Sequence, residues 1–178
     1  MIRIENHAWT YMLARAVAAY PDECCGAMLG RRHSEVKSIT RALELENSFS
    51  GPRRTRYEIR PEDLLEAQRL ARLDGLDVLG IYHSHPDCDA YFSETDLKNS
   101  CPWYSFVVLS IRAGRFDHAR GFLPHPDQTR AEPEDLAYPE QSAEQSVTGG
   151  TGTTIVETQP PAPGLSNEEI LLNRRSVK

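Results

Sequence analysis

Hydrophobic and polar residues alternate along the first third of the chain with the periods of a helix and then of strands. Apolar side chains spaced three and four residues apart predict a helix over about 8–20, which ends at Pro21. A short apolar run at 23–30 predicts a buried strand, and a less regular alternation predicts a second strand over 35–45. The chain is therefore expected to begin with a helix and two strands.

The next segment centres on a buried strand. A short strand is expected at 57–59, and Pro61, suited to a first helical position, opens a helix that continues to about residue 73. The apolar run 77–82 predicts a buried strand, and a short helix is expected to start near Ser93.

Two further strands, 104–111 and 115–122, are expected to form a hairpin through an Ala-Gly turn. The predicted order, α-β-β-β-α-β-α-β-β, is typical of an α+β domain in which helices flank a mixed sheet. From residue 124 the chain becomes rich in Pro, Gly, Ser and Thr, a composition that buries little apolar surface. We therefore expect one folded domain over 1–123 and a flexible tail over 124–178. Segment 167–174 has the capping pattern of a possible short helix, although a frayed end is the preferred interpretation.

Charge and composition exclude several classes of protein. The 178 residues carry 26 Asp and Glu against 20 Lys and Arg, a formal net charge of −6, so the basic face of a nucleic-acid binder is not expected. No apolar run has the length of a membrane span, and the first residues lack the apolar core of a signal peptide. The four cysteines fit no disulfide framework. We expect a cytoplasmic protein with neither nucleic acid nor membrane as a partner.

The candidate chemistry follows the predicted strand 77–82. His83 and His85 alternate along an extended chain, so both side chains project from the same face. Asp96 lies at the start of the next expected helix and can return a carboxylate oxygen to them. Two histidines, one carboxylate and a position left for water are typical of a catalytic zinc site.

The same residues allow a structural interpretation. Ser93 and Asp96 have the spacing of a capping box, and a carboxylate occupied at its own helix end is less free to bind a metal. Cys88, three residues after His85, is either a substitute ligand or a free thiol on a loop. The sequence leaves these alternatives open at this point.

The spacing His83-Ser84-His85, seven residues, Ser93, two residues, Asp96 resembles the motif of the JAMM (MPN+) family of zinc metallopeptidases. The stretch 21–30 also resembles the first strand of that family, and Glu23 falls where its catalytic glutamate stands. The resemblance covers about 1–123 and is greatest to short prokaryotic members, several of which act on ubiquitin-like sulfur-carrier proteins. It implies a single JAMM/MPN domain with a layout like that of the cytidine deaminases.

The resemblance also implies a role for each residue. His83, His85 and Asp96 would hold one Zn²⁺ per chain, whose charge lowers the pKa of a bound water. Glu23 would take the proton of that water and pass it to the leaving amine, although its spacing alone favours an ordinary surface carboxylate. Ser93 would donate to the developing oxyanion.

The implied function is that of a peptidase or isopeptidase. It would hydrolyse amide bonds at the C-terminus of a ubiquitin-like protein, such as a sulfur carrier that bears cysteine. The alternative is a non-catalytic scaffold of the same fold, but the complete ligand set argues against it. Zinc-dependent deamination requires His-x-Glu and Pro-Cys-x-x-Cys, and position 85 is His while the second pattern is absent.

Overall fold

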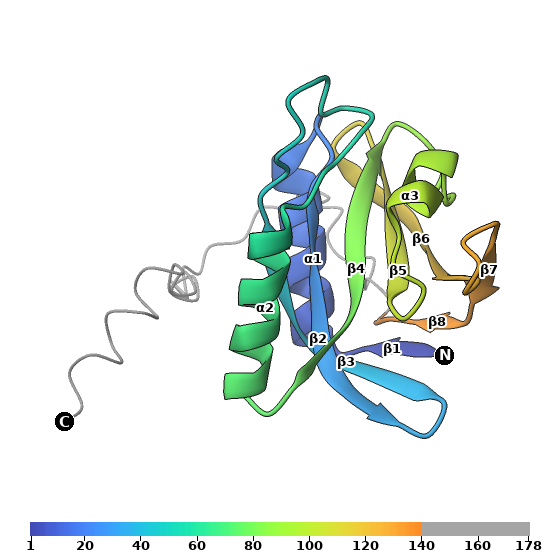
Figure 1. Cartoon of the computed structure of the whole chain (residues 1–178). Coiled ribbons are helices and arrows are strands. Elements are labelled where there is room, and N and C mark those ends of the chain that lie inside the picture. The colour runs from blue at the N-terminus through green and yellow to red at the C-terminus, as the bar shows by residue number, and fades with distance from the viewer. Residues whose placement is uncertain (140–178) are drawn as a thin grey trace, which may run out of the picture. The chain divides into compact units, whose positions relative to one another are not determined.

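The computed structural model describes residues 1–139, which form an eight-stranded sheet with helices against it (Figure 1). The elements in chain order are β1 (Ile2–Ile4), α1 (Asn6–Ala19), β2 (Cys25–His33), β3 (Val36–Leu45), α2 (Pro61–Leu73), β4 (Asp77–Pro86), α3 (Glu94–Asn99), β5 (Ser105–Arg112), β6 (Arg115–Pro124), β7 (Ala131–Glu134) and β8 (Leu136–Ala137). The expected α+β class with a mixed sheet is confirmed. None of the described helices is long and apolar enough to cross a membrane.

The sheet curls on itself. Its strand order is β7-β6-β5-β4-β2-β3-β1-β8, and only Asp135 separates the two edge strands β7 and β8 in the chain. The edges are therefore brought together, and Asp135 accepts a hydrogen bond from the backbone of Ile2. A buried ion pair joins the two sides, with Lys37 Nζ of β3 3.0 Å from Glu134 Oε1 of β7.

The two faces of the sheet are covered by different helices. On β2, Met28 belongs to a core with α1, whereas its neighbours Ala27 and Leu29 pack in a second core with α2, because successive strand residues point to opposite faces. A third cluster extends the α2 side and contains Ile81, Tyr104 and Phe106. His83 and His85 share the parity of Ile81 along β4, so they project toward the α2 side.

The long elements follow the sequence prediction closely. The helix expected over 61–73 has these bounds in the structure, and the helix expected over 8–20 begins at Asn6. Residues 57–59, expected as a strand, do not join the sheet. The reason is local. The Glu58 carbonyl accepts from the backbone N–H and the hydroxyl of Ser48, and the Glu58 N–H donates to Asn47 Oδ1, so this backbone bonds to the loop at 47–48 and not to a strand of the sheet.

The sheet also continues past the expected domain boundary at residue 123. β6 ends at Pro124, and β7 and β8 follow within the segment that composition assigned to the tail. Pro133 is tolerated there because β7 is an edge strand. Its outer side has no neighbouring strand in the described sheet that would need a hydrogen bond from the N–H that proline lacks. Tyr138 then stacks on Trp9, with ring centroids 4.3 Å apart. The rest of the expected tail, with the possible helix at 167–174, lies outside the described residues.

Candidate metal centre

The two histidines lie at the end of the central strand. β4 pairs with β2 on one side and with β5 on the other, so the backbone that carries them is fixed from both sides. The Nε2 atoms of His83 and His85 lie 3.2 Å apart, and the two side chains are buried. The expectation that strand alternation puts both rings on one face is confirmed.

Asp96 reaches the histidines from the first turn of α3. Its Oδ1 lies 3.5 Å from His83 Nε2, and its Oδ2 lies 3.9 Å from His85 Nε2. Oδ2 also accepts hydrogen bonds from the backbone N and the Oγ of Ser93, which completes a capping box. The two interpretations of Asp96 are therefore compatible, because Oδ2 caps the helix while Oδ1 is free to face His83.

This cluster fits a small divalent metal ion. His83, His85 and Asp96 each offer one ligand atom, and these atoms all lie within 4.8 Å of one another. Ligands on a tetrahedral zinc with bonds near 2.0 Å are separated by about 3.3 Å. The observed separations of 3.2 Å between the histidine nitrogens and 3.5 Å from His83 to Asp96 are close to that value. The cluster found among the described residues does not include Cys88.

The two imidazole rings are oriented in different ways. Nδ1 of His85 lies 3.0 Å from the carbonyl oxygen of Asp89, to which it donates. Nδ1 of His83 is buried and has no hydrogen-bond partner among residues 1–139. Instead, the ring of Tyr57 stacks on His83, with centroids 4.6 Å apart and an angle of 29° between the planes. The stacked ring of Tyr57 thus restrains the orientation of His83, as the hydrogen bond to Asp89 restrains that of His85.

Glu23 lies beside this cluster rather than on the open surface. Its side chain is 7% exposed, and it lines the same cavity as His85 and Asp96. Its backbone is held on both sides, because its N–H donates to Arg53 and its carbonyl accepts from Asn47. The interpretation of Glu23 as an ordinary surface carboxylate does not fit this burial.

Ser84 fixes the chain next to Glu23. Its Oγ accepts from the backbone N of Cys24 at 3.0 Å, and its own N–H donates to the Cys24 carbonyl. As alternation predicts, the Ser84 side chain points away from the histidines. It holds the start of β2 against β4 and so keeps Glu23 near His83.

The charges of the site are interdependent. Burial raises the pKa of Glu23 to about 7, and Asp96 adds to this effect while His83 opposes it. Burial also lowers the pKa of His85 to about 4, which keeps this ring neutral and ready to act as a ligand. For Asp96, burial opposes ionisation, but His83 and Ser93 outweigh it and hold the pKa far below its usual value. Asp96 is therefore a carboxylate at neutral pH.

His83 behaves differently from His85. Burial acts to lower its pKa, but the charge of Asp96, the hydrogen bond to Asp96 and the charge of Glu23 together outweigh burial and raise the pKa above the ordinary value. A metal ion that binds here must displace any proton on the ring, so binding is expected to weaken as the pH falls.

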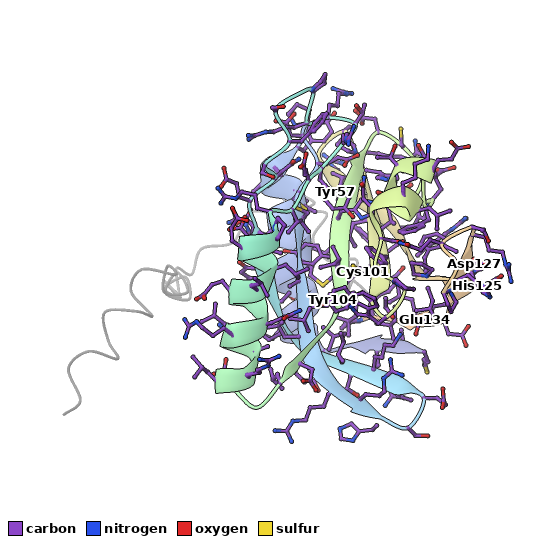
Figure 2. All side chains as sticks on the ribbon, viewed as in Figure 1. Tyr57, Cys101, Tyr104, His125, Asp127 and Glu134 are labelled. Carbon is purple, nitrogen blue, oxygen red and sulfur yellow. The ribbon has the colours of Figure 1, made fainter. Side chains whose placement is uncertain are left out.

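A cavity of about 770 Å³ opens from the His-His-Asp cluster along the α2 side of β4. Polar residues of the site form one part of its wall, and apolar side chains form the rest. Figure 2 labels three of the lining residues, Tyr57, Cys101 and Tyr104, which follow one another alongside β4 next to α2. The apolar lining includes Ile59, Leu64, Ile81, Tyr104 and Phe106. The cavity is far larger than a metal ion and its water need.

The sequence pattern did not identify two residues that are important to this geometry. Tyr57 lies in an expected short strand, and Asn47 in an expected loop. Asn47 Nδ2 donates to the carbonyls of Glu23 and Arg56, and its Oδ1 accepts from the backbone N–H of Phe49 and Glu58. It therefore ties Glu23 to the segment that walls the cavity.

Comparison with known proteins agrees with this site. The model of the prokaryotic homologs of the JAB domain matches residues 5–120. The chain belongs to this family. The resemblance to JAMM (MPN+) proteins, drawn from the spacing of the metal ligands, is thereby confirmed.

Individual relatives support the same assignment. The desampylase of Haloferax volcanii is 34% identical over 91 residues, which are 51% of this chain and 63% of that protein. The CysO-cysteine peptidase of Mycobacterium tuberculosis is 33% identical over 103 residues, 57% of this chain and 67% of that protein. The match thus spans less than two thirds of the desampylase.

A solved structure shows the fold independently. The solution structure of a protein from Desulfitobacterium hafniense superimposes with a TM-score of 0.68 at 28% identity, covering 79% of this chain and 94% of that one.

Proposed function

We propose that this chain is a zinc-dependent metallopeptidase that hydrolyses an amide bond at the C-terminus of a ubiquitin-like carrier protein. The observation that carries the proposal is the buried carboxylate of Glu23, which lies beside a complete His-His-Asp cluster in one cavity. The names of two relatives, a desampylase and a CysO-cysteine peptidase, support a small protein conjugate as the substrate class, such as a sulfur carrier with a C-terminal cysteine.

His83, His85 and Asp96 are the residues that would hold the zinc. When bound, zinc supplies a Lewis acid that polarises the scissile carbonyl and lowers the pKa of a bound water. The neutral ring of His85 and the ionised Asp96 already have the protonation states of ligands at neutral pH.

Glu23 is proposed as the proton carrier. A carboxyl with a pKa of about 7 is present in both protonation states near neutral pH, so it can accept a proton and release it again. It would take the proton from the attacking water and deliver it to the nitrogen of the leaving amine. The burial that raises its pKa also keeps bulk water from competing for this proton.

Ser93 is proposed to stabilise the negative charge that develops on the substrate carbonyl oxygen. In the structure its hydroxyl donates to Asp96 Oδ2 at 2.6 Å, so it must exchange this bond for one to the substrate. Oxyanion donors of this kind contribute about 2–4 kcal/mol to transition-state binding.

The cavity favours an extended polypeptide as the ligand. Its volume of about 770 Å³ and its apolar lining match a protein tail that lies against the sheet better than a small polar metabolite. We further propose that the protein acts in the cytoplasm, which fits the free state of Cys24, Cys25, Cys88 and Cys101.

The test uses the full chain and a carrier protein with a C-terminal cysteine adduct. We expect close to one zinc per chain in the wild type and in Glu23→Gln, and little in Asp96→Ala. Glu23→Gln should bind zinc yet lose at least ~100-fold in kcat. Full hydrolysis by zinc-loaded Glu23→Gln would reject the assignment of Glu23. Binding of the carrier without cleavage by the wild type would favour the scaffold alternative.

A further inference from the structure

The loop between β4 and α3 contains the carbonyl that orients His85, so the position of this loop matters to the metal centre. The carbonyl oxygen of Asp89 accepts from His85 Nδ1 at 3.0 Å. A shift of this oxygen would let the ring turn, and Nε2 would then no longer face His83 and Asp96. The question is what holds the loop.

Groups on β5 and β6 hold the backbone on both sides of Asp89. Ser110 Oγ donates to the carbonyl of Cys88 at 2.6 Å, and the backbone N–H of Ala90 donates to Nε2 of His118 at 3.2 Å. Arg112 also pairs with the Asp89 carboxylate. Asp89 is thus fixed through the residues immediately before and after it.

His118 is itself held in the form that can accept this bond. Its Nδ1 lies 3.0 Å from Asp117 Oδ2, and the same oxygen accepts from Arg112 Nε at 2.9 Å. A neutral imidazole that donates from Nδ1 to a carboxylate has an unprotonated Nε2. That lone pair is the acceptor for the N–H of Ala90, a fully buried residue whose donor would otherwise be left without a partner.

We propose that His118 is a positioning residue of the metal centre. His118 holds the backbone of Ala90, and this fixes the position of the Asp89 carbonyl. The carbonyl in turn orients the ring of His85 for metal binding. The relay runs from Asp117 on β6 to His85 on β4, and His118 is not among the residues that line the cavity. The inference rests on the metal binding of the proposed function and adds to it a residue outside the motif.

The chain offers a matched control. His125 is also paired with a nearby aspartate, with Nδ1 2.8 Å from Asp127 Oδ1, and its side chain is 38% exposed against 30% for His118. Figure 2 labels His125 and Asp127 together next to β7, away from α2. A general cost of losing a histidine beside an aspartate should therefore affect both positions alike.

The experiment compares His118→Phe, His118→Gln and His125→Phe with the wild type. Phe keeps a ring but offers no acceptor, whereas the Gln amide oxygen can reach the place of Nε2. The affinity for zinc is measured by competition with a chelator, and the visible absorption of the cobalt-substituted protein reports the ligand geometry. Thermal unfolding of the metal-free proteins shows whether each variant is folded.

We expect His118→Phe to bind zinc about 10- to 100-fold more weakly and to alter the cobalt spectrum, because losses in the outer shell have effects of this size. His118→Gln should stay close to the wild type, and His125→Phe should be unchanged. Wild-type affinity and spectrum in His118→Phe, or an equal loss in His125→Phe, would overturn the inference.

A second variant tests the relay in case His118→Phe does not fold. Ser110→Ala removes the bond to Cys88 on the other side of Asp89 together with a long 3.5 Å contact to Asp117 Oδ2, and it keeps the shorter bond of Asp117 to His118. If His118→Phe does not fold, weakened zinc binding by folded Ser110→Ala supports the relay, and unchanged binding rejects it. Failure of the wild type to bind zinc at all would overturn the proposed function, and the relay with it.

Discussion

Ser93 and Asp96 bind each other in both directions, and the arrangement leaves one oxygen of Asp96, Oδ1, for His83. Asp96 N donates to Ser93 Oγ at 3.0 Å, while Ser93 N and Oγ donate to Asp96 Oδ2 at 2.8 and 2.6 Å. Oδ1 is thereby directed at His83 Nε2, 3.5 Å away. The helix cap thus fixes the rotation of the carboxylate that we propose as a metal ligand.

Ser93→Ala is expected to weaken both the fold and the metal site. Loss of a helix cap costs about 1 kcal/mol of the free energy of unfolding, which urea denaturation of the metal-free protein measures. Zinc affinity should fall as well, because Asp96 Oδ2 loses its bond to the hydroxyl.

Ser100→Ala is the control at the other end of α3. Ser100 Oγ donates to the carbonyl of Leu97 at 2.8 Å, whereas the hydrogen bonds of Asp96 within α3 go to Ser93. This variant should lose stability while zinc affinity stays the same. A similar loss of zinc affinity in both variants would show that helix stability, and not the rotation of Asp96, governs binding.

Glu23 should destabilise the metal-free fold at alkaline pH. Its pKa is raised from 4.5 to about 7 by burial, so the folded state favours the protonated form. This contribution to stability is complete below the unfolded pKa, near 4.5, and is lost as the pH rises through 7. Glu23→Gln stays neutral, so at pH 8 it should be more stable than the wild type by about 1–3 kcal/mol.

Chemical denaturation at a series of pH values, with a chelator present, measures this difference. The advantage of Glu23→Gln should shrink steadily as the pH is lowered toward 4.5. A difference that does not vary with pH would mean that Glu23 is equally charged in the folded and unfolded chains.

Tyr57 is expected to matter for zinc affinity through its ring. Because His83 Nδ1 has no hydrogen-bond partner among residues 1–139, the stacked Tyr57 is what restrains this ligand. Tyr57→Leu should weaken zinc binding about 10-fold, whereas Tyr57→Phe keeps the ring and should bind normally. Chelator competition measures both variants.

Tyr91 provides the comparison on the other ligand. Its ring meets His85 edge-on, with centroids 4.8 Å apart, but His85 is also held by the Asp89 carbonyl. Tyr91→Leu should therefore affect zinc affinity less than Tyr57→Leu. The reverse order would show that the hydrogen bond of His85 does not fix its ring.

Asn47 is expected to affect catalysis without affecting the metal. It holds the Glu23 carbonyl and the segment that walls the cavity, but it contacts none of the three ligands. Asn47→Ala should lower kcat/KM at least 10-fold, about 1.4 kcal/mol in transition-state binding, at an unchanged zinc content. Asn47→Asp keeps the acceptor but loses both donors, so its activity should be similarly low. Loss of zinc in Asn47→Ala would contradict the separation of these two roles.

Local patterns in the sequence determined the long elements and indicated three residues that could hold a metal ion. Pro61 and the apolar spacing that follows it gave the bounds of α2, and the alternation along β4 placed His83 and His85 on one face. These features depend on periods of 3.6 and 2 residues, which can be read from neighbouring positions. The spacing to Asp96 added the third ligand.

Tertiary structure decided the features that depend on residues far apart in the chain. β1, β7 and β8 are short and gain their stability from pairing, so the Pro-rich composition after residue 123 hid the last two. The burial of Glu23, the stacking of Tyr57 and the bond from Ala90 to His118 likewise arise from contacts across the fold. The sequence thus specified which residues could bind a metal. Packing determined how each of these side chains is oriented, and burial raised the pKa of the Glu23 carboxyl to about 7.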